Sequence, residues 1–189
     1  MAKTYRPVPI PAGVELRVES DTVTAKGRLG ILSIPKPDGV LVKTEDNKLV
    51  VEGDANTSRR VVGTTRALII NMLVGVTQGY ERVVELRGMG YRIQKTKEGL
   101  QATCGFSHPV DIVAPPGITL DVNQVPNPED TKEQMFEIII KGIDKHAVGA
   151  MAARIRAIKP PDSYHGKGFR YRGERVRKKA GKRAVGAQQ

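Results

Sequence analysis

Basic and aromatic side chains alternate near the end of the chain, between Ser163 and Arg183. This stretch, SYHGKGFRYRGERVRKKAGKR, holds nine of the chain's 31 Lys and Arg residues and a single Glu. Guanidinium groups bind phosphates at two points, and aromatic rings stack on unpaired bases. The chemistry offered by these residues is therefore the binding of a polyanion. Because a block of like charges usually stays solvated, a basic terminus without a fixed path is the alternative interpretation.

The residues of this stretch fall into three chemical groups. Phosphate contacts are expected from Lys167, Arg170, Arg172, Arg175, Arg177, Lys178 and Lys179, with His165, Lys182 and Arg183 as further candidates. The aromatic residues Tyr164, Phe169 and Tyr171 are expected either to stack on bases or to pack the stretch onto the protein. Gly166 and Gly168 let the backbone approach a ligand closely.

Motifs of catalysis and cofactor binding are incomplete in this sequence. A Walker phosphate loop needs Gly five residues before its Gly-Lys pair and Ser or Thr after it, but Pro161 and Gly168 stand at those positions around Lys167. RGMGYR lacks the third Gly of a dinucleotide-binding loop. The three His residues lack metal-ligand spacing, and Cys104 is expected to be a buried hydrophobe rather than a nucleophile. We expect no enzyme, cofactor, metal or small-molecule substrate.

The overall composition favours a nucleic-acid partner. The chain has 189 residues, a formal net charge of +11 and a pI near 9.9, and 39% of its residues are hydrophobic, enough for a folded core. The first residues lack the apolar centre of a signal peptide. No apolar run approaches the roughly 18 residues of a membrane span, and a single Cys excludes a disulfide framework. We expect a cytoplasmic chain without a membrane partner, with an organellar location as the alternative.

Two kinds of periodicity divide the first part of the chain. Short β-type runs separated by turns extend from Val14 to Glu52. From Val61 to Val76 the apolar residues recur at spacings of three and four, which predicts a helix with one apolar face. Asn56, Thr57 and Ser58 are candidate N-caps, and Gly79 is a candidate stop.

The same order returns in the second part of the chain. Further β-type runs extend from Arg82 to Gly142, and a second helix has its apolar face from Ala147 to Ile158 and ends at a Pro pair. KPDGVLV matches PPGITL, LVVEG matches IIIKG, and each helix contains Val-Gly, which indicates an internal duplication. We therefore predict an α+β fold of two duplicated small domains, each an antiparallel sheet with one packed helix, followed by a basic tail.

The predicted boundaries follow from this duplication. Residues 1–79 form the first repeat, residues 80–160 the second, and residues 161–189 the basic C-terminal tail. The Pro-rich stretch VPNPEDTKEQ, Val125–Gln134, is expected to be a surface insertion in the second repeat. Gly63 and Gly149 stand inside the two helices, where Gly is unfavourable, and predict a close approach of each helix to its sheet.

Four long motifs occur along the chain in an order that carries a family resemblance. They are GTTRALIINMLVGVTQGY in the first helix, RGMGYR at Arg87–Arg92, GFSHPV at Gly105–Val110 and PPDSYHGKGFRY at Pro160–Tyr171. The chain resembles the bacterial large-subunit ribosomal protein six family from Pro9 to Lys182. The resemblance implies two duplicated α+β domains. It also implies binding of large-subunit rRNA, chiefly by the second domain and tail, near the stalk base where translation factors dock.

The resemblance adds expected RNA contacts outside the tail. These are Arg87, Tyr91 and Arg92 in RGMGYR, Ser107 and His108 in GFSHPV, and Lys159 before the Pro pair. For Ser107 and His108, a loop ordered by Pro109 is the alternative. Neighbouring large-subunit ribosomal proteins are further expected partners, and the nearly neutral first domain is expected to contact protein or to act as a spacer.

Two other classes of protein stay open at this point. A general RNA- or DNA-binding module outside the ribosome would share the basic tail, but no recognition helix of basic and polar residues is present. An RNA-processing enzyme would need a catalytic constellation that the motifs do not supply. We therefore predict a structural rRNA-binding protein that acts in translation as part of the large ribosomal subunit.

Overall fold

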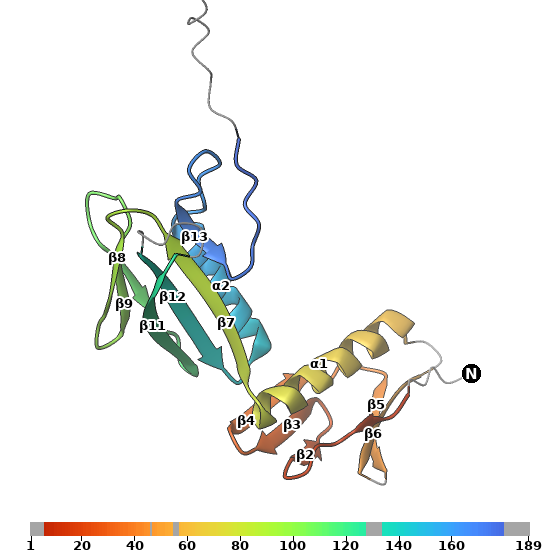
Figure 1. The fold of residues 1–189 in the computed structure, drawn as a ribbon. Helices are drawn as coiled ribbons and strands as arrows, with labels where there is room; N and C mark the ends of the chain where they lie inside the picture. Colours follow the sequence, from red (N-terminus) through yellow and green to blue (C-terminus); the bar gives the residue numbers. More distant parts are fainter. Residues whose placement is uncertain (1–5, 46, 55–56, 128–133, 180–189) are drawn as a thin grey trace, which may run out of the picture. The chain divides into compact units, whose positions relative to one another are not determined.

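The structure is a computed structural model that describes residues 6–45, 47–54, 57–127 and 134–179. One series of short strands precedes the first of two helices, a second series lies between the helices, and one strand follows the second helix. The ribbon is drawn in Figure 1. Four features of the sequence lie outside the described residues: the expected contacts at Lys182 and Arg183, the candidate cap Asn56, and most of the Val125–Gln134 insertion.

The chain divides into two compact units. The first runs up to Tyr80 and includes Gly142–Val148, and the second comprises Glu81–Lys141 and the residues from Gly149 onward. The first unit thus ends within one residue of the boundary at 79–80 expected from the repeats. Gly142–Val148, which includes the first four residues of the second helix, groups with the first unit instead.

The first unit contains two three-stranded sheets. Their strands are β1 (Val8–Pro9), β2 (Glu15–Val18), β3 (Thr22–Gly27), β4 (Gly30–Pro35), β5 (Val40–Glu45) and β6 (Lys48–Gly53). The order is β1-β6-β5 in one sheet and β2-β3-β4 in the other. The predicted β-type runs correspond to β2 through β6. The two-residue β1 is not among them, because the Pro residues around it have no N–H to donate and argue against a strand.

Helix α1 (Arg59–Thr77) covers the sheets of the first unit through contacts with β3, β4 and β6. Ser58 is its N-cap, since the Ser58 side chain accepts a hydrogen bond from the Arg60 backbone N–H at 3.3 Å. Gly79 follows the helix in the left-handed region, with φ of +76°, and donates its N–H to the Gly75 carbonyl at 3.1 Å. Both predicted ends of the helix are therefore confirmed.

By length and composition alone, α1 is apolar enough to cross a membrane. One apolar face of the helix is, however, buried within the first unit. Val62, Ile69, Met72 and Val76 are at most 3% exposed and form one core with residues of the strands. An apolar face covered in this way is the arrangement of a core helix.

The second unit contains a four-stranded and a three-stranded sheet. Its elements are β7 (Tyr80–Arg87), β8 (Arg92–Lys95), β9 (Gly99–Thr103), β10 (Val110–Val113), β11 (Ile118–Pro126), β12 (Gln134–Gly142), α2 (Lys145–Ile158) and β13 (Gly168–Tyr171). The strand order is β11-β12-β7-β13 in the larger sheet and β10-β9-β8 in the smaller one. In Figure 1, α2 runs along the larger sheet and β13 lies beside β7.

The predicted duplication is confirmed by the strand order. The sheet order β5-β6-β1 of the first unit returns in the second as β11-β12-β7, and the meander β2-β3-β4 returns as β8-β9-β10. Gly39 before β5 and Gly117 before β11 have nearly equal left-handed φ angles of +74° and +81°. Each therefore supplies the same turn before the corresponding strand, which explains why the repeat retains Gly there.

The sequence predicts that each helix approaches its sheet closely at a helical glycine. Gly149 in α2 is exposed, and a Cβ built there has no neighbour within 4 Å, so the prediction is wrong for α2. The close contacts lie under α1, at glycines of the strands. A Cβ at Gly27 would lie 2.6 Å from the Val76 carbonyl oxygen, and one at Gly53 would lie 2.5 Å from Val62 Cγ2.

Strand β13 changes the interpretation of the tail. It begins eight residues into the segment expected to be a separate tail from residue 161, yet it pairs antiparallel with β7, from Gly168 opposite Arg87 to Tyr171 opposite Val84. The described part of the first unit contains no counterpart of β13. A run of four residues is too short to predict a strand from its sequence. Its place in the sheet depends on β7, which lies about 80 positions earlier in the chain.

Candidate nucleic-acid interface

The loop between α2 and β13 is closed by backbone hydrogen bonds. The Phe169 N–H donates to the Lys159 carbonyl and the Asp162 N–H to the Lys167 carbonyl, both at 2.8 Å. The Asp162 carboxylate accepts the backbone N–H of Tyr164 at 3.2 Å and of His165 at 2.7 Å. This loop therefore has one defined shape, and it presents the Tyr164 ring, 54% exposed, and the exposed His165 ring to solvent.

Gly168 is required where this loop enters β13. Its φ is +134°, and a Cβ would lie 2.7 Å from the Pro160 carbonyl oxygen. Gly166 is also buried and left-handed, with φ of +74°. Both glycines thus serve close packing within the protein, and the structure provides no evidence for the backbone approach to a ligand that their type suggests.

Two expected contact side chains of β13 are buried. Phe169 is 0% exposed and lies in the core of the second unit, so its ring packs the strand onto the domain and is not available for stacking on a base. Arg170 is 4% exposed, and its Nη2 donates to the Gly166 carbonyl at 3.0 Å. It stands opposite Glu85 in the β7–β13 register. We therefore correct the phosphate role of Arg170 to a structural one.

The residues after β13, Arg172–Lys179, here called the basic segment, follow a fixed path. The Arg172 N–H donates to the Val83 carbonyl at 3.1 Å, and the Lys179 N–H donates to the Ser163 carbonyl at 2.7 Å. Their expected phosphate-binding side chains are exposed: Arg172, Arg175, Arg177, Lys178 and Lys179. Both ends of the basic segment are thus hydrogen-bonded to the rest of the second unit.

Lys159 brings the three motifs of the second unit together. Its Nζ donates to the Cys104 carbonyl at 2.7 Å and lies 5.3 Å from the centre of the Tyr91 ring and 5.0 Å from that of Phe106. These partners belong to RGMGYR and to the loop that contains GFSHPV, and Lys159 itself precedes the Pro pair. The ammonium is therefore engaged within the protein, and its main visible role is to join these loops.

The loop after β9 exposes an aromatic side chain that is not among the contact residues expected from the sequence. Phe106 is 43% exposed, and its ring stacks with that of His108 at 6.3 Å between centroids. Ser107 and His108 are also exposed, as expected. An apolar residue between Gly and Ser in a turn is the only sequence signal that could have marked Phe106, and such a signal is weak.

Arg87 and Arg92 have different surroundings. The Arg87 side chain is 11% exposed and forms an ion pair with Glu85, with Nη2 2.8 Å from Oε2, so an exposed RNA contact at Arg87 is not what the structure shows. Arg92, in β8, is exposed.

Tyr171, at the end of β13, is partly buried and has the Arg156 guanidinium 5.6 Å from its ring centre. Lys167 is partly buried in the closed loop.

Cys104 is fully buried, and burial raises the pKa of its thiol, while nearby Lys159 lowers it. A thiol with a raised pKa is a poor nucleophile, so the expectation of a buried hydrophobe is confirmed. Among the described residues, no group of three or more His, Cys, Asp or Glu is placed to hold a metal ion.

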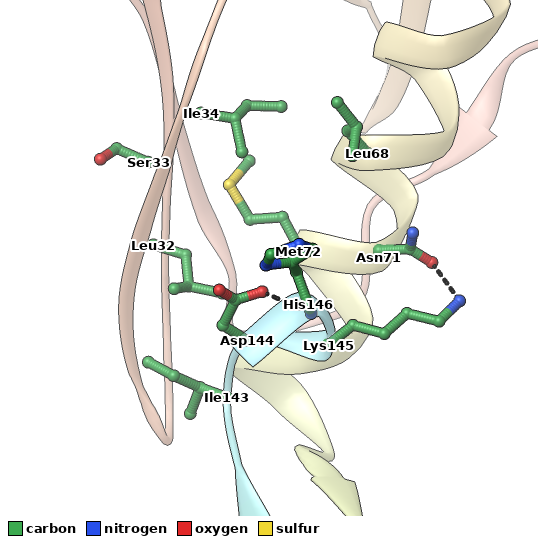
Figure 2. Close-up of a pocket in the computed structure, with 10 residues that line it drawn as sticks. All are labelled: Leu32, Ser33, Ile34, Leu68, Asn71, Met72, Ile143, Asp144, Lys145 and His146. Carbon is green, nitrogen blue, oxygen red and sulfur yellow. Dashed lines mark hydrogen bonds between the residues drawn. The ribbon is translucent and has the colours of Figure 1, made fainter. Parts of the chain in front are cut away.

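Figure 2 shows a pocket in the first compact unit, lined by α1, β4 and the segment from Ile143 to His146. Its lining is largely apolar, with Leu32, Ile34, Leu68, Met72 and Ile143. Two of its polar side chains bond each other, since Lys145 Nζ donates to Asn71 Oδ1 at 3.0 Å. The Asp144 carboxylate caps α2 by accepting the His146 backbone N–H at 2.9 Å. Asn71, Lys145 and Asp144 therefore have hydrogen-bond partners within the first unit.

Comparison with known proteins gives the family of this chain. The family described as ribosomal protein L6 matches residues 10–79 and 87–172. The chain belongs to the ribosomal protein L6 family. The two matched segments coincide with the two repeats, and the second extends through β13 to Arg172. The family resemblance carried by the four motifs is thereby confirmed.

The chain is similar to proteins named large ribosomal subunit protein uL6 over almost the full length of each relative. The protein from Hahella chejuensis is 49% identical over 180 residues, which is 94% of this chain and 96% of the relative. The one from Alkalilimnicola ehrlichii is 47% identical over 90% of this chain and 92% of the relative. The one from Moorella thermoacetica is 45% identical over 94% and 92%. Members of the ribosomal protein L6 family are structural constituents, which confirms that the chain is not an enzyme.

Proposed function

We propose that the chain binds large-subunit rRNA through its second unit and that the basic segment contacts the phosphates. Membership of the ribosomal protein L6 family supports a structural role in the large ribosomal subunit. The observation that carries the proposal is the fixed path of the basic segment between β13 and the Lys179–Ser163 hydrogen bond. Cations that are already held in place neutralise crowded phosphates at a lower entropic cost than a free tail.

The proposed mechanism is placement of RNA. The closed loop, the Lys159 junction and the basic segment meet adjacent rRNA helices and fix how these helices pack. The proposed position is near the stalk base, beside the region where translation factors dock, in the cytoplasmic ribosome. The resemblance of PPDSYHGKGFRY and GFSHPV to motifs of the family supports this position.

Neighbouring large-subunit proteins are the proposed partners of the first unit. Its surface exposes several large apolar side chains that suit protein contact better than phosphate contact: Leu29, Ile31, Leu41 and Leu68, each at least 45% exposed. Such side chains are favoured at protein interfaces when they lie together with polar residues.

Sedimentation with the large subunit tests the proposal, with paired variants of equal charge change. Arg175→Gln with Arg177→Gln removes two exposed cations from the basic segment, whereas Lys26→Gln with Arg28→Gln removes two exposed cations from the first unit. We expect the first pair to weaken binding to large-subunit rRNA by about tenfold or more at physiological salt and the second pair to have little effect. Equal effects of the two pairs, or a wild-type chain that stays at the top of the gradient, would contradict the proposal.

Directed cleavage tests the position. A cleavage reagent attached at Arg175→Cys, in a Cys104→Ala chain that lacks the native thiol, generates hydroxyl radicals beside the basic segment. Cuts in the rRNA near the stalk base are the expected result. A reagent at Arg28→Cys serves as the control for the first unit. Cuts confined to distant rRNA would exclude the proposed position while leaving rRNA binding in place.

A further inference from the structure

The Phe106–His108 pair is an exposed aromatic surface that the proposed phosphate contacts leave unused. Phe106 is 43% exposed, its ring plane makes an angle of 25° with that of His108, and His108 is exposed as well. A Phe ring left in water forgoes the favourable free energy of burial. The loop is anchored at both ends, because β9 and β10 pair on either side of it from Ala102 opposite Val110 onward.

Lys159 holds this pair in position. Its Nζ lies 5.0 Å from the centre of the Phe106 ring and is anchored by the 2.7 Å hydrogen bond to the Cys104 carbonyl. Gly105, with φ of +80°, makes the turn between these two contacts. A cation held beside an aromatic ring attracts it, so the Phe106 ring is preorganised on the surface. A preorganised ring loses little conformational entropy when it binds a ligand.

We propose that Phe106 and His108 form a stacking site for one unpaired base of the bound RNA. The proposal rests on the proposed function, and it adds a base contact to the phosphate contacts. A flat exposed ring pair accepts another flat π system, which is a nucleobase or an aromatic side chain of a protein. The net charge of +11 favours the ligand that carries negative charge along its backbone, and this is the nucleic acid.

Two single strands of equal length and charge isolate base stacking from charge. The full chain is titrated with a strand of ten uridines and with a strand of ten abasic ribose phosphates. Stacking of one base on an aromatic ring contributes a factor of about five or more in affinity, so the wild-type chain should prefer the uridine strand by at least about that factor. Phe106→Ala should remove the preference, and Phe106→Trp should retain it.

Several results would overturn the stacking site. These are equal affinity of the wild-type chain for both strands, no measurable affinity for either, or full preference in Phe106→Ala. Loss of preference in Phe106→Ala with equal loss in Phe106→Trp would also overturn it, since the larger ring keeps a π face. If Phe106→Ala instead loses a crosslink to a neighbouring ribosomal protein while keeping base preference, the pair is a protein contact.

A separate measurement distinguishes this proposal from the proposed function. Phe106→Ala leaves the basic segment intact, so its affinity for large-subunit rRNA should fall by no more than the loss of one stacked base, and it should unfold at nearly the wild-type temperature, because the ring is only partly buried. A wild-type chain that binds large-subunit rRNA but shows no base preference retains the proposed function and excludes only the stacking site.

Discussion

The Arg156 guanidinium holds the Glu174 carboxylate at two points, with Nε 3.1 Å from Oε2 and Nη2 2.6 Å from Oε1. Arg156 lies on α2, and Glu174 is the single acid of the stretch from Ser163 to Arg183. Glu174 also accepts the Tyr171 backbone N–H at 2.9 Å. The pair therefore ties the start of the basic segment to the second helix, and it holds in place the cations that surround it.

Neutralising this pair should destabilise the second unit. Glu174→Gln keeps the size of the side chain but replaces charge-assisted hydrogen bonds with weaker ones, so the free energy of unfolding should fall by about 1–2 kcal/mol. Arg156→Gln should have a similar effect, and the double variant should cost little more than either, because both changes remove one interaction. Chemical denaturation measures these values. Arg17→Gln, which breaks the exposed pair with Glu15, is the control, and additive effects at Arg156 and Glu174 would contradict the coupling.

The same pair predicts a dependence of stability on pH. The hydrogen bond from Arg156 is the main cause that lowers the pKa of Glu174. A carboxyl whose pKa is lowered by folding adds stability that is fully present above its unfolded pKa, near 4.3, and is lost as pH falls through the folded pKa. Between about pH 5 and pH 3, urea denaturation should therefore show a steeper loss of unfolding free energy in the wild type than in Glu174→Gln. Parallel curves would rule this out.

Arg170 and Arg172 are two residues apart and should respond differently to the same change. Arg170 is 4% exposed, so Arg170→Gln should lower the free energy of unfolding by about 1–3 kcal/mol, since it disturbs buried hydrogen bonds. The Arg172 side chain is 64% exposed, so Arg172→Gln should leave stability nearly unchanged. It should instead reduce by about one the slope of log affinity for rRNA against log salt, as for one lost phosphate contact. Thermal unfolding and a salt titration, run on both variants, test the contrast. A loss of stability in Arg172→Gln but not in Arg170→Gln would show that burial does not decide the role of these two residues.

Lys159 should act by positioning loops rather than by contacting phosphate. Lys159→Met keeps an unbranched side chain but removes the ammonium that bonds Cys104 and lies beside Tyr91 and Phe106. We expect rRNA affinity to fall while the slope of log affinity against log salt stays constant. Lys159→Arg should restore part of the affinity, because a guanidinium also donates to a carbonyl and interacts with rings. Lys179→Met, at an exposed residue of the basic segment, is the control in which the slope should fall. A reduced slope in Lys159→Met would assign a direct phosphate contact to Lys159.

Truncation should separate the basic segment from the strand that precedes it. A chain that ends at Ser163 loses β13 and the fully buried Phe169, whose removal alone is expected to cost about 3–5 kcal/mol. The second unit of that chain should unfold at a much lower temperature by circular dichroism. A chain that ends at Lys179 keeps every described element and should unfold like the full chain. If the shorter chain retained wild-type stability, the contribution of β13 to the fold would be excluded.

Local patterns in the sequence determined much of this protein. The helix over Val61 to Val76 follows from apolar residues at spacings of three and four, and its ends follow from Ser58 and Gly79, because such signals act within one or two turns of the chain. Matching strings around Gly39 and Gly117 revealed the duplication, since equal turns need equal residues. Residue types between Ser163 and Arg183 indicated a polyanion partner, because charge and aromatic content do not depend on the fold.

Only the tertiary structure decided which of these residues reach the surface. Phe169 and Arg170 look like binding residues in sequence, but pairing of β13 with β7 buries both, and a pairing partner about 80 positions away leaves no local signal. Lys159 looks like one more surface cation, yet it meets Tyr91, Cys104 and Phe106 from two other loops. Exposure and convergence are properties of long-range contacts, and for that physical reason composition and periodicity could not assign them.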